Sequence, residues 1–396
     1  MSAPVAPGFS FRTLAVDGHA RTGVLTTPHG EVPTPTFMPV GTQGSVKGLS
    51  PEEVAATGAR VVLGNTYHLW LRPGPELIDA LGGLHAFCRW PRAMLTDSGG
   101  FQAFSLAQAG PRTATSKVSA GAKVSEDGVV FRSHLDGSKR AMSPEESMRV
   151  QGLIGADIAM QLDECPPLSD EKVRDRAAIE RAVARTTRWG KRCLDVWRRD
   201  YRERGRALFG IVQGGTFADL RIAHADELGA LDFDGLALGG FSVGEPIAMM
   251  YETLAEVAHR LDPERPRYLM GVGTPIDLLE AIEHGVDMFD CVLPTRNARN
   301  GQALTRFGKV NIKQARFRED PRPLDEACGC PCCRGGFARA YLRHLFLAGE
   351  MLVLRLLSAH NLHTYGALTE GARAAIAQGR YAAFKRDFVD RYQRGE

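Results

Sequence analysis

The sequence predicts an α/β fold in which eight parallel strands close into a (β/α)8 barrel. Two observations predict it: short apolar runs recur along most of the chain, and helix-length segments with start signals separate most of them. Apolar runs without polar alternation are typical of strands buried on both faces, as in a parallel sheet covered by helices. We expect antiparallel insertions and a separate cysteine-rich segment in addition to the barrel.

The composition is that of a globular protein with a large core. The chain has 396 residues, 44% of them hydrophobic and 24% charged, which excludes a disordered chain and a small disulfide scaffold. Residues 1–14 lack the charged and apolar regions of a secretion signal, so we expect a soluble cytoplasmic protein whose eight cysteines are reduced. The richest apolar stretch, MLVLRLL, is interrupted by Arg355, and we expect no membrane helix.

Each predicted strand is followed at once by Gly, Asn, Asp, Glu or Gln. In chain order the runs are FMPVG from Phe37, VVLGN from Val61, AMLTD from Ala93, IAMQLDE from Ile158, FGIVQGG from Phe209, LALGG from Leu236, YLMGVG from Tyr268 and MFDCV from Met288. Eight strands are the number that closes a parallel α/β barrel.

The segments between the runs carry helix start signals. In SPEEVAATGA from Ser50 and SPEESMRVQGLIGA from Ser143, the serine can cap a helix and proline occupies the first helical position. Residues 109–140 differ, because they are rich in Gly, Ser and Val and alternate in polarity. That segment predicts an antiparallel insertion.

The polar residues that end the runs form the candidate site, because the carboxyl ends of barrel strands meet at one mouth that carries the chemistry. A single aspartate at such a position is more typical of a turn or a cap. A turn or a cap at every position does not account for three aspartates and a glutamine at one mouth. Together these residues indicate a catalytic site. The residues are Asn65, Asp97, Asp163, Glu164, Gln213, Gly239, Gly240, Gly271 and Asp290.

Half of the cysteines lie in one short patch, which indicates a metal site. Cys328, Cys330, Cys332 and Cys333 are followed by His344, His360 and His363. Zn²⁺ in structural sites takes four thiolate or imidazole ligands in a tetrahedron. Cys330 and Cys333 have the better chelating spacing, and His360 is favoured as the fourth ligand. A full Cys3His shell, completed by Cys328, leaves no open position, so we expect a structural zinc; a metal-free cluster and a catalytic metal are the alternatives.

Positive charge is concentrated in two stretches. Residues 171–206 contain 13 Lys or Arg against 6 Asp or Glu, and residues 290–322 contain 8 against 3, giving +7 and +5. Because the whole chain carries 49 − 46 = +3, the remainder is −9. Either stretch could bind a phosphate backbone, although a solvated helix face explains the first equally well.

Several motifs closely resemble those of the bacterial tRNA-guanine transglycosylases, in family order and over nearly the whole chain. They are DSGGFQ from Asp97, FRSHLDGSKR from Phe131, QLDECPP from Gln161, GIVQGG from Gly210, GGFSVGE from Gly239, YLMGVGTP from Tyr268, DMFDCVLPTRNARNGQA from Asp287 and the C-x-C-x2-C…H cluster. The resemblance implies a TIM barrel over residues 1–300, a zinc-binding subdomain over 301–360 and a helical segment over 361–396.

The resemblance also implies the reaction. The wobble guanine of tRNAs with GUN anticodons (Asp, Asn, His and Tyr) is exchanged for 7-aminomethyl-7-deazaguanine (preQ1) in queuosine biosynthesis. Asp290 is the implied nucleophile, which forms a covalent enzyme–RNA ester, and Asp97 is the implied general acid and base. Two inversions at the ribose restore the configuration, as in a retaining glycosidase.

By the same resemblance, Ser98 and Asp163 face the pyrimidine edge of the base, and Gln213 and the Gly240 amide contact its carbonyl oxygen. Phe101 and Met270 sandwich the ring. Cys165, Gly239 and Phe241 complete the pocket, although the family usually has Leu-Ala where this chain has Phe241 and Ser242. Further implied features are Arg296 and Arg299 beside the anticodon bases, a structural zinc on Cys328, Cys330, Cys333 and His360, and a homodimer.

Three other functions agree less well with the sequence. The archaeal type of the enzyme usually has additional carboxyl-terminal RNA-binding domains, for which we expect no room beyond the cysteine cluster. A non-catalytic tRNA-binding subunit would be expected to have lost the carboxylates that Asp97 and Asp290 retain. A barrel glycosidase or hydrolase acting on small molecules would not explain Arg296, Arg299 and the separation of charge.

Overall fold

A computed structural model describes residues 8–103, 122–166 and 175–395 of the chain. Within this part, every predicted run forms a parallel strand, so the barrel prediction is confirmed. The strands are β4 (Thr36–Met38), β5 (Val40–Gly41), β6 (Val61–Gly64), β7 (Ala93–Thr96), β11 (Ile158–Met160), β12 (Ala207–Val212), β13 (Gly235–Leu238), β14 (Arg267–Leu269) and β15 (Met288–Asp290).

These strands form one closed sheet with the order β4-β15-β14-β13-β12-β11-β7-β6-β5. Only Pro39 separates β4 from β5, so a single run pairs with β15 through Met38 and with β6 through Val40. Because both ends of the sheet belong to that run, the carboxyl ends of all the strands surround one mouth.

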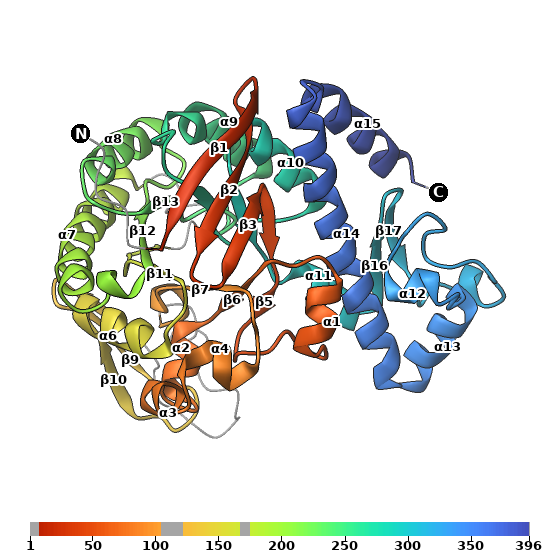
Figure 1. Cartoon of the computed structure of the whole chain (residues 1–396), viewed down its shortest axis with the longest axis horizontal. Helices are drawn as coiled ribbons and strands as arrows, with labels where there is room; N and C mark the ends of the chain where they lie inside the picture. Colours follow the sequence, from red (N-terminus) through yellow and green to blue (C-terminus); the bar gives the residue numbers. More distant parts are fainter. Residues whose placement is uncertain (1–7, 104–121, 167–174, 396) are drawn as a thin grey trace.

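Helices cover the outside of the barrel (Figure 1). They are α1 (Pro51–Ala56), α2 (Thr66–Leu71), α3 (Pro75–Ala80), α4 (Gly83–Cys88), α6 (Pro144–Ile154), α7 (Arg176–Asp200), α8 (Ala218–Gly229), α9 (Ile247–Val257), α10 (Pro275–Glu283) and α11 (Leu293–Arg299). Short 3-10 helices span Arg202–Arg204 and Ala258–Arg260. As predicted, Ser50 and Ser143 cap α1 and α6, and each is followed by proline at the first helical position.

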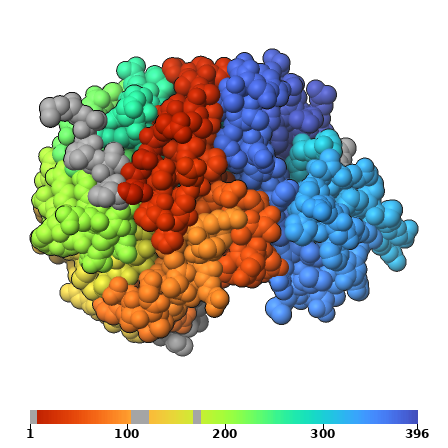
Figure 2. All heavy atoms as spheres, viewed as in Figure 1, coloured from red at the N-terminus to blue at the C-terminus, as the bar shows by residue number. Residues whose placement is uncertain are grey.

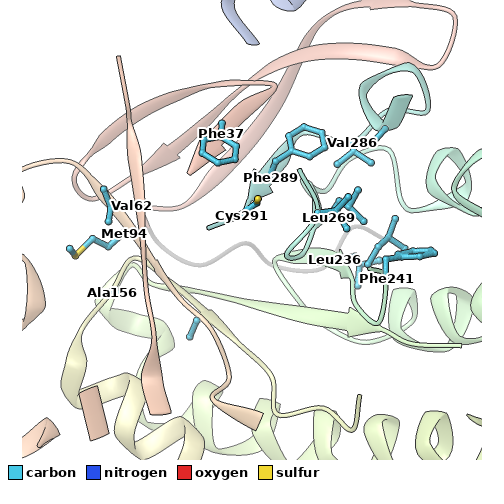
Figure 3. Packing of buried hydrophobic residues seen from close by; sticks show 14 of the residues in the cluster. Phe37, Val62, Met94, Ala156, Leu236, Phe241, Leu269, Val286, Phe289 and Cys291 are labelled. Atoms are coloured by element: carbon cyan, nitrogen blue, oxygen red, sulfur yellow. The ribbon is translucent and has the colours of Figure 1, made fainter. Parts of the chain in front are cut away.

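Successive strand residues point alternately to the inside and the outside of the barrel. Val61 and Leu63 belong to the inner cluster, whereas Val62 belongs to the layer between strands and helices. Figure 3 shows part of this outer layer, in which Leu236, Leu269 and Phe289 come from adjacent strands.

A three-stranded antiparallel sheet precedes the barrel, and its apolar residues Phe9, Leu25 and Val32 join the inner cluster. It consists of β1 (Ser10–Asp17), β2 (Ala20–Thr27) and β3 (Gly30–Thr34). The predicted antiparallel insertion is present as β8 (Lys123–Ser125), β9 (Gly128–Arg132) and β10 (Lys139–Met142). The part of that prediction at residues 109–121 lies outside the described residues.

A second lobe follows the barrel and lies beside it (Figure 2). It contains the hairpin β16 (Gln302–Thr305) and β17 (Gly308–Asn311), the 3-10 helix Ala315–Phe317, α12 (Pro331–Arg334) and α13 (Arg339–Ala348). Helix α14 (Met351–Ala377) packs on this lobe and also on β4, and α15 (Tyr381–Arg394) follows it. Residue 360 lies inside α14, so the expected boundary there cuts a continuous helix, and the division of the chain into domains stays a prediction.

None of the helices in the described ranges is long and apolar enough to cross a membrane.

Candidate active site

Asp97 is buried at the end of β7, where the loop after β6 holds its carboxylate. The Thr66 amide donates to Oδ1 at 2.8 Å, and the Asn65 side-chain amide donates to Oδ2. Burial raises the pKa of Asp97 to about 7, and the negative charges of Asp290 and Asp163 contribute to the rise. A carboxyl group with this pKa can give up and take back a proton at neutral pH, as general acid–base catalysis requires.

Asp290 ends β15 and is held through one of its oxygens only. The Tyr268 hydroxyl donates to Oδ1 at 2.6 Å, and the Gly271 amide donates to the same atom at 2.7 Å. Among the described residues nothing donates a hydrogen bond to Oδ2. Burial raises the pKa of Asp290, whereas these two donors oppose the rise because they favour the ionised form. One oriented carboxylate oxygen therefore remains available to attack a substrate.

A second cluster of polar side chains lies beside Asp97. The Ser98 hydroxyl donates to Oδ1 of Asp163 at 3.2 Å, and the Gln213 amide donates to its Oδ2 at 2.7 Å. Burial raises the pKa of Asp163 to about 6, and the two donors limit the rise. With the Gln213 amide and the Asp163 carboxylate side by side, the cluster can present both donors and acceptors to a polar ring.

The glycines after β13 allow the backbone to approach Gln213 closely. Gly240 has a φ of +68°, and a Cβ atom there would lie 2.3 Å from Oε1 of Gln213. Gly239 is also restricted, because a Cβ atom there would lie 2.7 Å from Nε2 of the Gln213 side chain. Phe241 and Cys165 are buried around this point. Burial raises the pKa of Cys165 to about 12, so its thiol is not an active nucleophile at neutral pH.

The two predicted stacking residues differ in exposure. Phe101 follows the start of the helix that begins at Gly100 and is 45% exposed, so an aromatic face is open to a ligand. Met270 follows β14, and its partly buried side chain packs on the inner cluster. These are the residue types expected on either side of a planar base.

The chain is similar to known proteins over almost its whole length. The family model described as queuine tRNA-ribosyltransferase matches residues 17–394. The chain belongs to the queuine tRNA-ribosyltransferase family. The protein of that name from Sorangium cellulosum is 70% identical over 383 residues, which cover 97% of this chain and 92% of the relative. The one from Nitratidesulfovibrio vulgaris is 54% identical over 382 residues, 96% of each chain. This ribosyltransferase is therefore an enzyme of the glycosyltransferase class, as the resemblance of its motifs implied.

The two basic stretches of the ribosyltransferase differ in how their charge is used. The arginines of α7 mostly form ion pairs with neighbouring acids, which are Arg176–Asp219, Arg185–Glu164, Arg188–Glu126, Arg192–Glu145 and Arg198–Asp232. Arg296 and Arg299 lie in the last turn of α11, just after Asp290, and Nη1 of Arg299 has no hydrogen-bond partner in the described residues. Burial and then the charge of Arg296 lower the pKa of Arg299. In the described part of the chain, Nη1 of Arg299 is therefore a donor of the second stretch that could bind an anion.

The ribosyltransferase also brings together the four predicted metal ligands. Nδ1 of His360 lies 3.6, 3.3 and 3.5 Å from the sulfurs of Cys328, Cys330 and Cys333. Tetrahedral zinc with Zn–S and Zn–N bonds of ordinary length places S and N about 3.6 Å apart, so the donor set fits this metal. Nε2 of His360 is fixed by the Leu304 carbonyl at 2.9 Å, as is typical of histidine ligands. Neither Cys332 nor His363 belongs to this group of described residues.

The contacts of two groups that hold the site were not predicted from the sequence. Tyr268 lies in the quoted motif YLMGVGTP, but its contact with Asp290 joins two different strands, and no local pattern indicates it. Asn65 was recognised as a strand-end residue, whereas its contact with Asp97 was not predicted. The position of each at a barrel strand could have suggested a role at the mouth.

Proposed function

We propose that this ribosyltransferase exchanges the wobble guanine of tRNAs with GUN anticodons for 7-aminomethyl-7-deazaguanine, through a covalent enzyme–RNA ester. The observation that carries the proposal is the pair of carboxylates at the mouth, Asp97 with a pKa of about 7 and Asp290 with one oxygen that accepts no hydrogen bond from the described residues. Because the substrate is tRNA, we expect the reaction to take place in the cytoplasm.

In the first step, Oδ2 of Asp290 forms a bond to the ribose anomeric carbon while the bond from that carbon to guanine breaks. The electron pair of the broken bond stays on guanine, and the proton of Asp97 neutralises it. In the second step, the incoming base attacks the same carbon, the ester breaks, and Asp97 takes the proton of the incoming nitrogen. Two inversions retain the configuration, and no water is consumed.

Base selection is assigned to the cluster around Asp163. A guanine-type edge offers donors to Asp163 and a carbonyl oxygen to the Gln213 amide and the Gly240 N–H. Phe101 and Met270 are the proposed stacking surfaces. The Glu245 carboxylate, which accepts hydrogen bonds from the Ser242 and Val243 amides, can balance the aminomethyl ammonium of the deazaguanine.

Binding of tRNA is assigned to Arg296 and Arg299, two positive side chains close enough for the charge of Arg296 to lower the pKa of Arg299. Zinc on Cys328, Cys330, Cys333 and His360 would have a complete ligand shell with no position for a substrate. Its proposed role is therefore structural, namely to stabilise the second lobe. A homodimer is part of the proposal.

Exchange can be tested with tRNA labelled in the wobble guanine. Without an added base, the label released should not exceed the amount of protein, because guanine leaves only as the ester forms; a free base should sustain release over many turnovers, and 7-aminomethyl-7-deazaguanine should be incorporated in preference to queuine. Continued release of label beyond one equivalent of protein without an added base indicates hydrolysis and contradicts the proposal. Preference for queuine contradicts the assigned base only.

A further inference from the structure

Arg221 on α8 is fully buried beside the proposed base pocket, with an exposed fraction of 0%. Buried arginines are normally paired with a carboxylate, because an unpaired charge away from water is costly. No carboxylate of the described residues hydrogen-bonds this guanidinium. Within the described residues, an ion pair therefore does not explain how this charge can be buried.

The guanidinium instead donates to three backbone carbonyls. Nε donates to Gly215 at 2.6 Å, Nη1 to Val212 at 3.2 Å and Nη2 to Gly240 at 3.3 Å. Val212 ends β12 and Gly215 lies in the loop after it, so the two residues flank Gln213, whereas Gly240 lies in the loop after β13. One side chain therefore ties together the two loops that carry Gln213 and the Gly240 amide.

The ring of Phe241 completes the environment of the guanidinium. Its centroid lies 3.7 Å from Cζ of Arg221, and the ring is 3% exposed. Stacking on an aromatic face stabilises a desolvated guanidinium and fixes its plane. Burial lowers the pKa of Arg221 to about 9, which still leaves the group protonated at neutral pH.

The backbone is packed on Arg221 with little free space. A Cβ atom at Gly214 would lie 2.6 Å from Cγ of Arg221, and Gly214 has a φ of +152°. The close approach at Gly240 to Oε1 of Gln213 adds to this restriction. Small shifts of either loop would change the angle between the Gln213 amide and the Gly240 N–H.

We propose that Arg221 is a positioning residue for base recognition, whose buried guanidinium fixes Gln213 and Gly240 at the angle that receives the carbonyl oxygen of the base. The inference rests on the proposed function, since that function supplies the base. The affinity for the free base would then depend on a side chain, Arg221, that does not contact the base. The fork geometry matters as well as the charge, because three carbonyls in different directions accept from one planar group.

Arg221→Met is the direct test, and Arg267→Met is its matched control. Arg267 is a buried arginine that donates to the carbonyls of Leu261 and Gly285, but it starts β14 at the opposite end of the barrel. Guanine binding is measured by calorimetry and tRNA binding by anisotropy. In Arg221→Met the Kd for guanine should rise about tenfold or more, as loss of charged hydrogen bonds predicts. The Kd for tRNA, dominated by phosphate contacts, should change less than about threefold.

Arg267→Met should lower stability without changing the Kd for guanine. Two milder variants keep the test decisive if Arg221→Met does not fold: Arg221→Lys, which keeps charge without the fork, and Phe241→Leu, which removes only the ring. Each should weaken guanine binding by a smaller factor than Arg221→Met. Wild-type affinity for guanine in all folded variants, or equal losses in Arg221→Met and Arg267→Met, overturns the inference. If one of these two overturning results is found and the wild-type protein still exchanges guanine, the inference about Arg221 fails but the proposed function stands.

Discussion

The Tyr268 hydroxyl donates to Oδ1 of Asp290 at 2.6 Å, and Oδ2 of the same carboxylate accepts no hydrogen bond from any described residue. The hydroxyl favours the ionised form of Asp290 and orients its free oxygen. Tyr268 thereby supports the proposed nucleophile, because desolvation alone would favour the neutral acid.

Replacing Tyr268 with phenylalanine should slow formation of the enzyme–RNA ester. Loss of one hydrogen bond to a charged group predicts a decrease of about tenfold to a hundredfold in the single-turnover rate, with little change in tRNA affinity. Tyr365→Phe is a suitable control, since that buried hydroxyl donates to the Gly273 carbonyl rather than to a carboxylate. Equal rates in the two variants would remove the assigned role of Tyr268.

The pH dependence of ester formation should report Asp97. Its pKa of about 7 means that the proton needed by departing guanine is present below pH 7 and lost above it. The single-turnover rate should therefore fall about tenfold per pH unit above 7, whereas Asp97→Asn should be slow and insensitive to pH in that range. A wild-type rate that is constant from pH 7 to pH 9 contradicts the assignment of Asp97 as the acid.

The metal assignment is tested by two neighbouring cysteines. Cys330→Ala should lose zinc and expose residues 301–360 to proteolysis, because three remaining ligands bind the metal much more weakly. Cys332→Ala should keep the metal, since Cys332 is buried but is not part of the ligand group. Metal content by mass spectrometry decides between them, and loss of zinc from both variants or from neither counts against the ligand set.

Salt dependence separates the two basic stretches. Each phosphate contact releases condensed counterions, so Arg296→Ala or Arg299→Ala should reduce the slope of log Kd for tRNA against log salt by about one. Arg192→Ala should leave the slope unchanged, because Arg192 is paired with Glu145 at 2.7 Å. A reduced slope in Arg192→Ala would assign RNA binding to α7 as well.

The barrel could be predicted because its strands are buried on both faces and therefore read as apolar runs, as at Val61 and Phe209. The first antiparallel sheet was not predicted, since much of β1 is exposed and its pattern carries little apolar signal. The charge of α7 could be counted but not assigned, because its acidic partners, such as Glu126 and Asp232, are distant in sequence.

Residues of the site were predictable where they end a strand, as Asp97 and Asp290 do. Groups that act through another residue were not. Arg221 lies inside a helix with no motif around it, and only the folded chain places its guanidinium against Gly240. The four candidate metal ligands were predictable because three of them are close in sequence, and the choice of His360 agrees with the group that the structure brings together.

The most direct test of the central claim is the mass of the protein after it is mixed with tRNA and denatured without added base. The wild-type protein should form an adduct with the mass of protein plus tRNA less one guanine. Asp290→Ala should form none, whereas Asp163→Ala, which keeps both reacting carboxylates, should form it slowly. An adduct of normal yield in Asp290→Ala, or no adduct in a wild-type protein that still exchanges guanine, would contradict the proposed reaction.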